Sequence, residues 1–255
     1  MSPPALSIVF PCFNEAGRLP HTMERYQASF PEDPAAVEFV IIDDGSTDST
    51  FAVAEKTATG DPRVRVLRSE PNHGKGFAVR IGVLSAEGEL VVFTDADGSY
   101  GPEQLARVVR ALERAPVAIG SRTATTETAE GPAAPPVGPA LRRAASRVFN
   151  AAMRLTLGVP FQDTQCGLKG FRRDAARALF GRARMDGFAF DAEILFLARR
   201  LGYEVIEVPV RATDRDGSKV RLAVDAIRML GEVWSVRRAA ARGAYDQMRV
   251  RDHAG

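Results

Sequence analysis

The chain has 255 residues, enough for one α/β domain or for one domain with a small appendage. Of its residues 45% are hydrophobic and 26% charged, which is ordinary for a soluble globular protein. Two cysteines, Cys12 and Cys166, exclude a disulfide framework, favour a reducing cytoplasm, and are expected to be small buried residues. The N-terminus has no signal-peptide pattern, and no apolar run approaches the roughly 18 residues that span a bilayer.

The net charge of +2 conceals an asymmetry along the chain. Residues 1–139 carry a net −7 and residues 140–255 a net +9. A basic second half favours an anionic partner such as a nucleic acid, a lipid headgroup or a phosphorylated acceptor. The alternative is a general bias of the sequence toward Arg and Ala, which stays open.

Short apolar runs alternate with helical patterns over the first 120 residues. Strands are predicted at 6–10, 37–42, 64–67, 90–94 and 117–120. Helices are predicted at 16–30, 47–58, 76–86 and 102–114, the last with Pro102 in its first turn. This order predicts an α/β fold, with a mostly parallel central sheet and helices on both faces.

The second half is less regular. Residues 123–139 are rich in Thr, Ala, Pro and Gly and are predicted to form a mobile loop. Helices are predicted at 140–157, 191–201 and 220–242, and a strand at 204–210. The first and last of these helices combine arginines with an apolar stripe, the last including Trp234, which suits a helix lying in a membrane interface. The alternative, that both stripes pack onto the core, stays open.

Polar clusters follow four consecutive predicted strands. The clusters are 11–15 (PCFNE), 43–48 (DDGSTD), 72–76 (NHGKG) and 95–97 (DAD). Ligands of open α/β sheets bind just past the carboxyl ends of the strands, so we expect all four clusters at one edge of the sheet. That coincidence predicts a ligand site more strongly than any one cluster does.

Each cluster suits part of a phosphorylated nucleotide ligand. Asp95 and Asp97 offer hard oxygens for Mg²⁺ or Mn²⁺ carrying a substrate phosphate, although alone they could form a solvated turn. Asp43 and Asp44 suit ribose hydroxyls or a base edge. In Gly74-Lys75-Gly76 the glycines would let the backbone approach the ligand while Lys75 reaches a phosphate. Ser46 or Thr47 suits a helix cap.

Together these motifs resemble the family 2 inverting glycosyltransferases, which have the GT-A fold. Three later segments, 163–171 (DTQCGLKGF), 188–193 (FAFDAE) and 217–220 (GSKV), are similar to the dolichyl-phosphate β-glucosyltransferase branch. The wider group includes dolichyl-phosphate mannose synthases and bacterial undecaprenyl-phosphate glycosyltransferases. The resemblance runs from about Ser7 to Val224.

The resemblance implies metal-dependent, inverting transfer of a sugar to a polyprenyl (dolichyl or undecaprenyl) monophosphate. UDP-glucose is the favoured donor and a GDP-sugar the alternative. Asp97 would bind Mg²⁺ or Mn²⁺, with Asp95 contacting the ribose or sharing the metal. The acceptor oxygen is already anionic, so a single displacement needs no strong general base and gives a β-linked product.

The resemblance also assigns the site residues. The donor side takes Pro11, Asn14, Glu15, Asp43, Asp44, Lys75, Asp95 and Ala96. The catalytic residues are Asp95, Asp97, Asp163 and Gln165, and the acceptor phosphate takes Arg122, Gln165, Lys169, Arg215 and Lys219. Asp163 would orient the sugar or the attacking oxygen, with a general-base role left open.

Some charged residues of this region have alternative roles, although a functional role is favoured for Arg122 and Lys219. Lys169 and Arg215 suit a surface charge equally well. Asp191 or Glu193 would face the sugar, but Asp191 suits the cap of its helix just as well.

We expect residues 1–220 to form the GT-A catalytic domain and residues 221–255 a C-terminal basic helix and tail. The domain would comprise a nucleotide-sugar half (1–122), the mobile loop (123–139) and an acceptor half (140–220). The protein is expected in the cytoplasm, peripheral on the cytoplasmic face of a membrane. Its expected partners are a nucleotide sugar, a polyprenyl phosphate and the membrane surface, without nucleic acid because no recognition module is present.

Two functional alternatives stay open. The first is a family 2 glycosyltransferase that uses a soluble or secondary-metabolite hydroxyl, for which Asp163 would serve as the base. The second is a nucleotide-sugar binding module without turnover, which the intact Asp95 and Asp97 pair disfavours. The sequence does not fix the oligomeric state and leaves a homo-oligomer open.

Overall fold

A computed structural model describes residues 3–30, 33, 36–122, 156–213 and 222–248. Its centre is a seven-stranded sheet in the order β3-β2-β1-β4-β6-β5-β7. The strands are β1 (Leu6–Cys12), β2 (Val37–Asp44), β3 (Val64–Ser69), β4 (Leu90–Thr94), β5 (Val117–Ser121), β6 (Leu168–Arg172) and β7 (Val205–Pro209). All neighbouring strands run parallel except β6, which is antiparallel to both β4 and β5.

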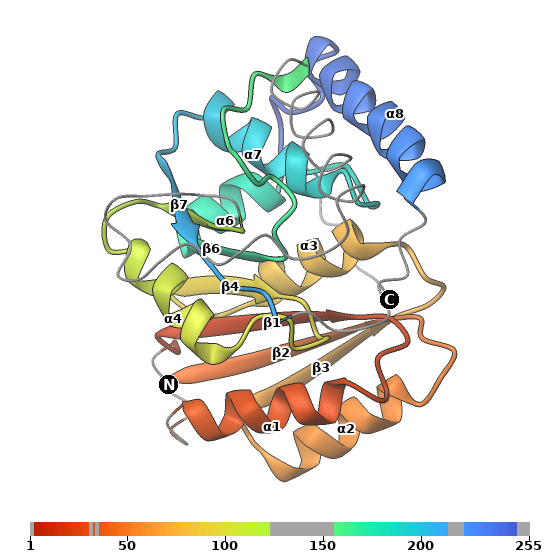
Figure 1. The fold of residues 1–255 in the computed structure, drawn as a ribbon, viewed down its shortest axis with the longest axis vertical. Helices are drawn as coiled ribbons and strands as arrows, with labels where there is room; N and C mark the ends of the chain where they lie inside the picture. Colours follow the sequence, from red (N-terminus) through yellow and green to blue (C-terminus); the bar gives the residue numbers. More distant parts are fainter. Residues whose placement is uncertain (1–2, 31–32, 34–35, 123–155, 214–221, 249–255) are drawn as a thin grey trace.

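Helices cover both faces of the sheet (Figure 1). One face carries α1 (Leu19–Ser29), α2 (Thr50–Gly60) and α4 (Pro102–Ala111). The other carries α3 (Lys75–Ser85), α6 (Arg173–Phe180) and α7 (Phe190–Arg200), with α8 (Leu222–Ala241) packed against α7. The predicted α/β architecture, with a mostly parallel sheet and helices on both faces, is confirmed.

Two apolar cores lie on the two faces because successive strand side chains point in opposite directions. In β1, Ile8 and Phe10 enter the core under α1, where Phe10 meets Tyr26 edge to face at 5.0 Å. Val9 enters the other core, where Phe93 and Phe171 stack at 6.3 Å. Strands buried on both faces explain the near-continuous apolar runs of the sequence.

The observed helices differ from the predicted ones mainly in the residue at which they begin. Helix α2 begins at Thr50 rather than 47, because Asp48 Oδ1 accepts the Thr50 backbone N–H at 2.9 Å. Neither Ser46 nor Thr47 caps this helix, so that expectation is wrong. Ser46 Oγ instead accepts the Asn14 N–H at 2.9 Å, linking the turns after β1 and β2.

Strand β6 and helix α6 were not predicted. The β6 sequence LKGFR contains a lysine, an arginine and a glycine, so it lacks the apolar pattern of the other central strands. A built Cβ at Gly170 would lie 2.9 Å from Val108 of α4, which explains why a small residue stands in this strand.

Several expectations lie outside the described residues. They are the mobile loop at 123–139, most of the basic helix at 140–157, and the segment containing Arg215 and Lys219. Within α8, Val233 and Val236 are buried while Trp234 is 57% exposed. The described part of that helix therefore packs onto the core through its valines, with the tryptophan facing outward.

Candidate active site

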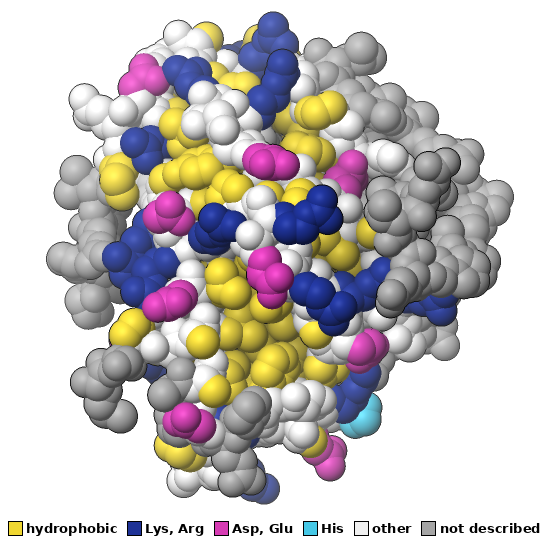
Figure 2. All heavy atoms as spheres, turned by 90° about the vertical axis from the view of Figure 1, so that its left-hand side faces the viewer, with side chains coloured by type: hydrophobic (Ala, Val, Ile, Leu, Met, Phe, Trp, Pro, Cys, Tyr) yellow, Lys and Arg dark blue, Asp and Glu magenta, His cyan; other side chains and the backbone are white. Residues whose placement is uncertain are grey.

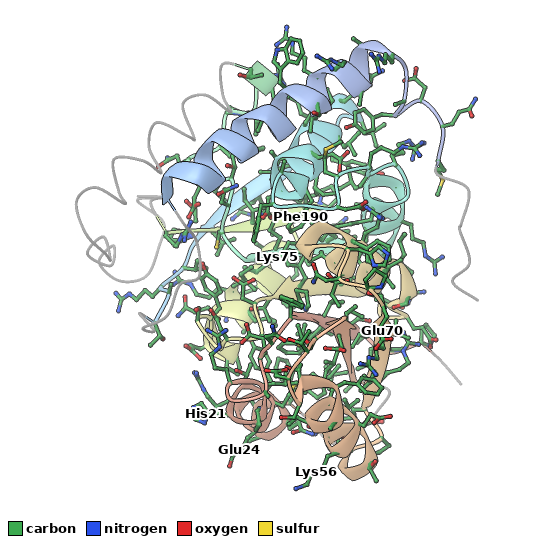
Figure 3. The ribbon with its side chains drawn as sticks, turned by 90° about the vertical axis from the view of Figure 1, so that its right-hand side faces the viewer. His21, Glu24, Lys56, Glu70, Lys75 and Phe190 are labelled. Atoms are coloured by element: carbon green, nitrogen blue, oxygen red, sulfur yellow. The ribbon has the colours of Figure 1, made fainter. Side chains whose placement is uncertain are left out.

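The carboxyl ends of β3, β2, β1 and β4 meet at one edge of the sheet. Figure 3 faces this edge, with Glu70 beyond β3 and Lys75 at the start of α3. The register places Cys12 opposite Asp43, and Asp43 opposite Arg68. The expectation that four polar clusters share one edge is confirmed.

Asp95 lies between a lysine and the turn before β6. Its Oδ1 accepts a hydrogen bond from Lys75 Nζ at 2.5 Å, and its Oδ2 lies against the backbone of Gly167. A Cβ at Gly167 would overlap this carboxylate, so a larger residue there would displace the Asp95 side chain. Burial lowers the pKa of Lys75, but the carboxylates of Asp95, Asp191 and Asp97 outweigh it and hold the pKa above its usual value.

Asp97 is the better placed of the two carboxylates for a cation. It is half-buried, and only its Oδ1 accepts a hydrogen bond among the described residues, from Ser99 N at 2.8 Å. No group of three or more His, Cys, Asp or Glu residues able to hold a metal occurs within those residues. Mg²⁺ typically binds one or two carboxylates plus substrate phosphates, so a strand-end pair fits such a shared ion.

Asp43 is a buried carboxylate without a hydrogen bond. It is 0% exposed, and neither oxygen accepts a hydrogen bond in the described structure. Arg68 Nε lies 3.3 Å from Oδ2 as an ion pair without hydrogen-bond geometry. Leaving such a group without hydrogen bonds is costly, and contact of Asp43 with a ligand stays a prediction.

Asp44 organises the protein instead. Its two oxygens accept from Ser69 Oγ at 2.7 Å, Asn72 Nδ2 at 2.9 Å and Gly74 N at 2.7 Å. The carboxylate thereby fixes the loop from β3 to Lys75. Asp44 therefore positions the loop that leads to Lys75. Contact of the Asp44 side chain with a ligand stays a prediction.

The turn after β1 also has mainly structural contacts. Asn14 has a φ of 57°, a left-handed conformation that Asn tolerates, and its Oδ1 accepts Thr47 N at 2.9 Å. Glu15 N donates to Thr50 Oγ1 at 2.7 Å. Pro11 is half-buried at the end of β1, and buried Ala96 accepts a hydrogen bond from Thr22 through its carbonyl. Contact with the sugar donor stays a prediction for Pro11, Asn14, Glu15 and Ala96.

The glycines around Lys75 make room for protein rather than ligand. Gly74 has a φ of 112°, and a Cβ there would lie 2.6 Å from the carbonyl oxygen of Asp186. A Cβ at Gly76 would lie 2.5 Å from the carbonyl oxygen of Met185 and 2.7 Å from Phe190 Cβ. These glycines therefore let residues 185–190 pack onto the start of α3 (Figure 3), while approach of the backbone to a ligand stays a prediction.

Arg122 and Asp163 form a two-point ion pair at the end of β5. Arg122 Nε and Nη2 donate to Asp163 at 2.7 and 2.9 Å, and the Arg122 N–H adds a bond at 3.0 Å. The Asp163 side chain is 2% exposed, whereas that of Arg122 is 43% exposed. Burial raises the pKa of Asp163, but Arg122 outweighs it, so the pKa lies below its usual value and the carboxylate is a weak base.

Glu207 supports this pair and was not singled out in the sequence. Its Oε1 accepts the backbone N–H groups of Gln162 at 2.9 Å and Asp163 at 3.3 Å. Burial raises the pKa of Glu207, opposed by these bonds. The sequence does not reveal this role, because a single glutamate within a strand gives no sign that its side chain reaches a turn distant in the chain. Gln165, in the same turn, is half-buried.

Lys169 is not a surface charge, so that alternative is wrong. It is 0% exposed, and its Nζ donates to Asp191 Oδ1 at 2.5 Å and to the Cys166 carbonyl at 2.6 Å. The capping role for Asp191 is also wrong, because α7 begins after Ala189 without a side-chain cap. Burial raises the pKa of Asp191 against the opposing charges of Lys169 and Lys75.

Glu193 holds protein segments together. It is 0% exposed and accepts Arg184 N at 2.8 Å, Met185 N at 2.9 Å and Tyr245 Oη at 2.7 Å. Burial raises its pKa, against the lowering effect of these bonds. All of these contacts are within the protein, so they give no support to the expectation that Glu193 faces the sugar.

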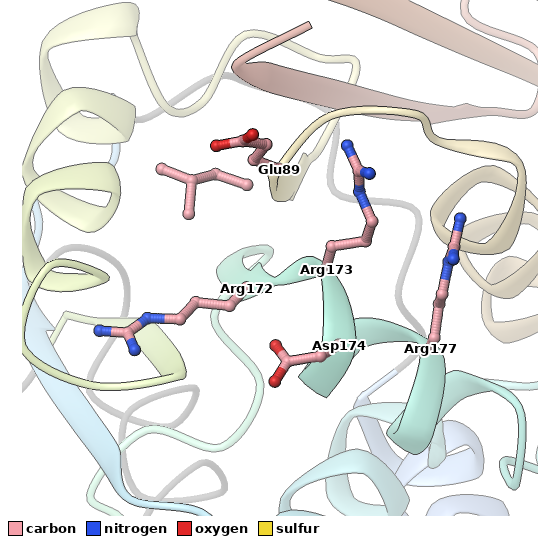
Figure 4. A pocket seen from close by; sticks show the side chains of 6 residues that line it. Glu89, Arg172, Arg173, Asp174 and Arg177 are labelled. Atoms are coloured by element: carbon pink, nitrogen blue, oxygen red, sulfur yellow. The ribbon is translucent and has the colours of Figure 1, made fainter. Parts of the chain in front are cut away.

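A shallow pocket at the opposite edge of the sheet is separate from this site (Figure 4). It is lined by Glu89, Leu90, Arg172, Arg173, Asp174 and Arg177. Arg172 Nε donates to the Leu112 carbonyl at 2.9 Å and Arg173 Nε to the Gly88 carbonyl at 2.8 Å. These arginines therefore bind loop carbonyls, and Figure 2 shows both signs of charge on this face.

Comparison with known sequences identifies the family of the chain. The family model described as Glycosyl transferase family 2 matches residues 7–180. The dolichyl-phosphate β-glucosyltransferase of Drosophila melanogaster is 36% identical over 229 residues, covering 84% of this chain and 69% of that protein. The Saccharomyces cerevisiae enzyme of the same name is 32% identical over 266 residues, covering 94% and 76%.

Solved structures share the fold. Glucosyl-3-phosphoglycerate synthase from Mycobacterium tuberculosis, crystallised with Mn²⁺, UDP and glucosyl-3-phosphoglycerate, superposes with a TM-score of 0.64 at 20% identity. The match covers 92% of this chain and 79% of that one. At this identity the likeness establishes the GT-A fold expected from the sequence. Among the described helices, none has the length and apolar character needed to cross a membrane.

Proposed function

The chain belongs to glycosyl transferase family 2, and from that premise we propose that it transfers glucose from UDP-glucose to a polyprenyl monophosphate, with inversion to a β-linked product. The dolichyl-phosphate β-glucosyltransferases of fly and yeast support this choice of substrates. The observation that carries the proposal is the contact of Gly167 with Asp95. That contact brings the turn at 163–167 directly against the Asp95 carboxylate at the end of β4.

The donor diphosphate would be held by Asp97 through a shared Mg²⁺ or Mn²⁺ ion and by Lys75. Structural neighbours crystallised with UDP and Mn²⁺ or Mg²⁺ support the choice of ion. Asp95 is already engaged by Lys75 and Gly167, which favours Asp97 as the metal ligand. The ion supplies neutralisation of the charge that develops on the leaving diphosphate.

The nucleoside would be recognised at the end of β2. The Asp43 carboxylate is buried and accepts no hydrogen bond in the described structure, so it suits a donor group on the base or ribose. Asp44 would support the same pocket by fixing the loop that carries Lys75. Asp43 would thus contact the ligand, and Asp44 would hold the protein loop.

Arg122 would bind the acceptor phosphate, and Asp163 would hold the Arg122 side chain in position. Arg122 is 43% exposed, and its bonds to Asp163 use Nε and one terminal nitrogen, which leaves Nη1 for a phosphate oxygen. A phosphate oxygen attacks without losing a proton, so the lowered pKa of Asp163 is no obstacle. Gln165 would contact the acceptor from the same turn. Contributions from Arg215 and Lys219 belong to the same proposal.

The lipid acceptor requires access to a membrane surface. Trp234 is 57% exposed on α8, and the Arg238 guanidinium lies 4.3 Å from the centre of its ring. An exposed tryptophan with arginines suits a helix in the headgroup region of a membrane. We therefore place 221–255 on the cytoplasmic face of a membrane beside a catalytic domain of residues 1–220.

Transfer of label into lipid tests the proposal. Purified protein receives polyprenyl phosphate, Mg²⁺ or Mn²⁺, and a panel of radiolabelled UDP- and GDP-sugars, and the organic phase is counted. We expect label from UDP-glucose. Binding of UDP without label in the lipid from any donor would reject the lipid acceptor, and label in an added soluble alcohol instead would favour a hydroxyl acceptor.

A further inference from the structure

Lys169 and Asp191 occupy an unexpected place beside the site. The β6 strand that carries Lys169 lies between β4 and β5, and the side chain is 0% exposed. Its ammonium nitrogen contacts Asp191 Oδ1 at 2.5 Å and the Cys166 carbonyl at 2.6 Å, and lies 5.6 Å from the centre of the Phe93 ring. The charge is therefore enclosed by protein.

The pair connects three segments of the site. The Cys166 carbonyl that Lys169 holds belongs to the turn whose next residue, Gly167, lies against Asp95. Asp191 lies in the first turn of α7, and the preceding Phe190 packs on Gly76 beside Lys75 (Figure 3). A single buried ammonium thus ties the turn at 163–167 to the helix that backs Lys75.

We propose that Lys169 and Asp191 are positioning residues, a buried brace that sets the turn at 163–167 against Asp95 without contacting the acceptor phosphate. This inference rests on the proposed function for its kinetic consequences. The ammonium is 0% exposed and already bonded to Asp191 and Cys166, so a phosphate could reach it only if the surrounding protein rearranged. The brace therefore aligns the acceptor side of the site with the donor side.

The central variants are Lys169→Met, Asp191→Asn and the double variant. Either single change should lower kcat by about 100-fold, because misplacement of the turn by about 1 Å has that effect. UDP affinity should fall far less than kcat, since Asp43 and the end of β2, which would bind the nucleoside, are not held by the pair. Amide hydrogen exchange of the peptide at 163–171 should accelerate in both single variants, a readout that needs no activity.

The double variant separates positioning from plain stability. It leaves no unpaired buried charge, so thermal stability should largely return. The Cys166 carbonyl still lacks its donor, so kcat should stay low and exchange at 163–171 fast. Recovery of kcat together with stability would overturn the proposal.

Direct phosphate binding by Lys169 predicts a different pattern. Lys169→Met would then raise KM for polyprenyl phosphate, whereas Asp191→Asn would keep near-normal kcat and exchange. That result would also overturn the brace. If wild-type protein labels no lipid, the proposed function fails, yet exchange and UDP binding still test the brace.

Two control variants match these changes. Lys56→Met alters an exposed lysine of α2 and should change nothing. Asp61→Asn breaks a buried ion pair with Arg63, whose Nη2 lies 2.6 Å from Asp61 Oδ2 at the far edge of the sheet. This variant should lose stability while kcat stays normal, and a kcat loss like that of Asp191→Asn would reject the interpretation.

Discussion

Replacement of Asp163 by Asn distinguishes a positioning carboxylate from a general base. The change keeps the shape of the side chain but removes the charge that accepts three hydrogen bonds from Arg122. Bonds to charged groups are worth roughly 1.5–3 kcal/mol each when fully buried. Arg122 is 43% exposed and can bind water instead, so we expect a total loss of about 2 kcal/mol in unfolding free energy.

The pH dependence of that loss follows from the lowered pKa of Asp163. A carboxylate whose pKa is lower in the folded state stabilises the fold above its unfolded pKa of about 3.9. The difference between wild type and Asp163→Asn in urea unfolding should therefore be full at neutral pH. It should shrink as the pH falls below about 4 through the folded-state pKa.

Kinetics decide the role of the carboxylate. If Asp163 only positions Arg122, then Asp163→Asn and Arg122→Gln should each lower kcat/KM by about 100-fold, with the double variant no worse. Loss of the acidic limb of the pH–rate profile in Asp163→Asn, with near-normal Arg122→Gln, would indicate a general base and refute this reasoning. Asp61→Asn is the control, because Arg63 also binds Asp61 at two points, at 2.9 and 2.6 Å.

Three further changes test the donor side. Asp43→Asn should weaken UDP binding about 10-fold in calorimetry, because it removes the buried carboxylate that would accept a hydrogen bond from the nucleoside. Unchanged UDP affinity would place the nucleoside elsewhere. Gly167→Ala should abolish transfer by displacing Asp95, and a crystal structure with Asp95 unmoved would contradict the account. Asp97→Asn should abolish metal-dependent UDP binding while the melting temperature stays near wild type, and retained metal dependence would reject its role.

The sequence predicts the first half of the fold well for a physical reason. Parallel strands buried on both faces produce apolar runs, and the predicted strand at 90–94 agrees with β4 residue for residue. The same logic locates the site, because the ends of parallel strands share one edge. Strand β6 escapes prediction because its lysine and glycine are explained only by partners distant in the chain, Asp191 and Val108.

The roles within the site were less predictable than its location. Asp43 and Asp44 are adjacent in sequence, yet one lacks hydrogen bonds and the other is saturated by the loop before Lys75. Lys169 reads as a phosphate ligand in the motif, but burial between β4 and β5 turns it inward. Which partner a charged residue meets depends on packing that local sequence does not encode.

The most direct test of the central claim is the structure of the reaction product. Wild-type protein, UDP-glucose, Mg²⁺ or Mn²⁺ and polyprenyl phosphate are incubated, and the organic phase is analysed by mass spectrometry and by proton NMR of the anomeric position. The account predicts a polyprenyl phosphate carrying one glucose in β linkage. An α-linked product, or glucose transferred only to water or a soluble alcohol, would contradict it.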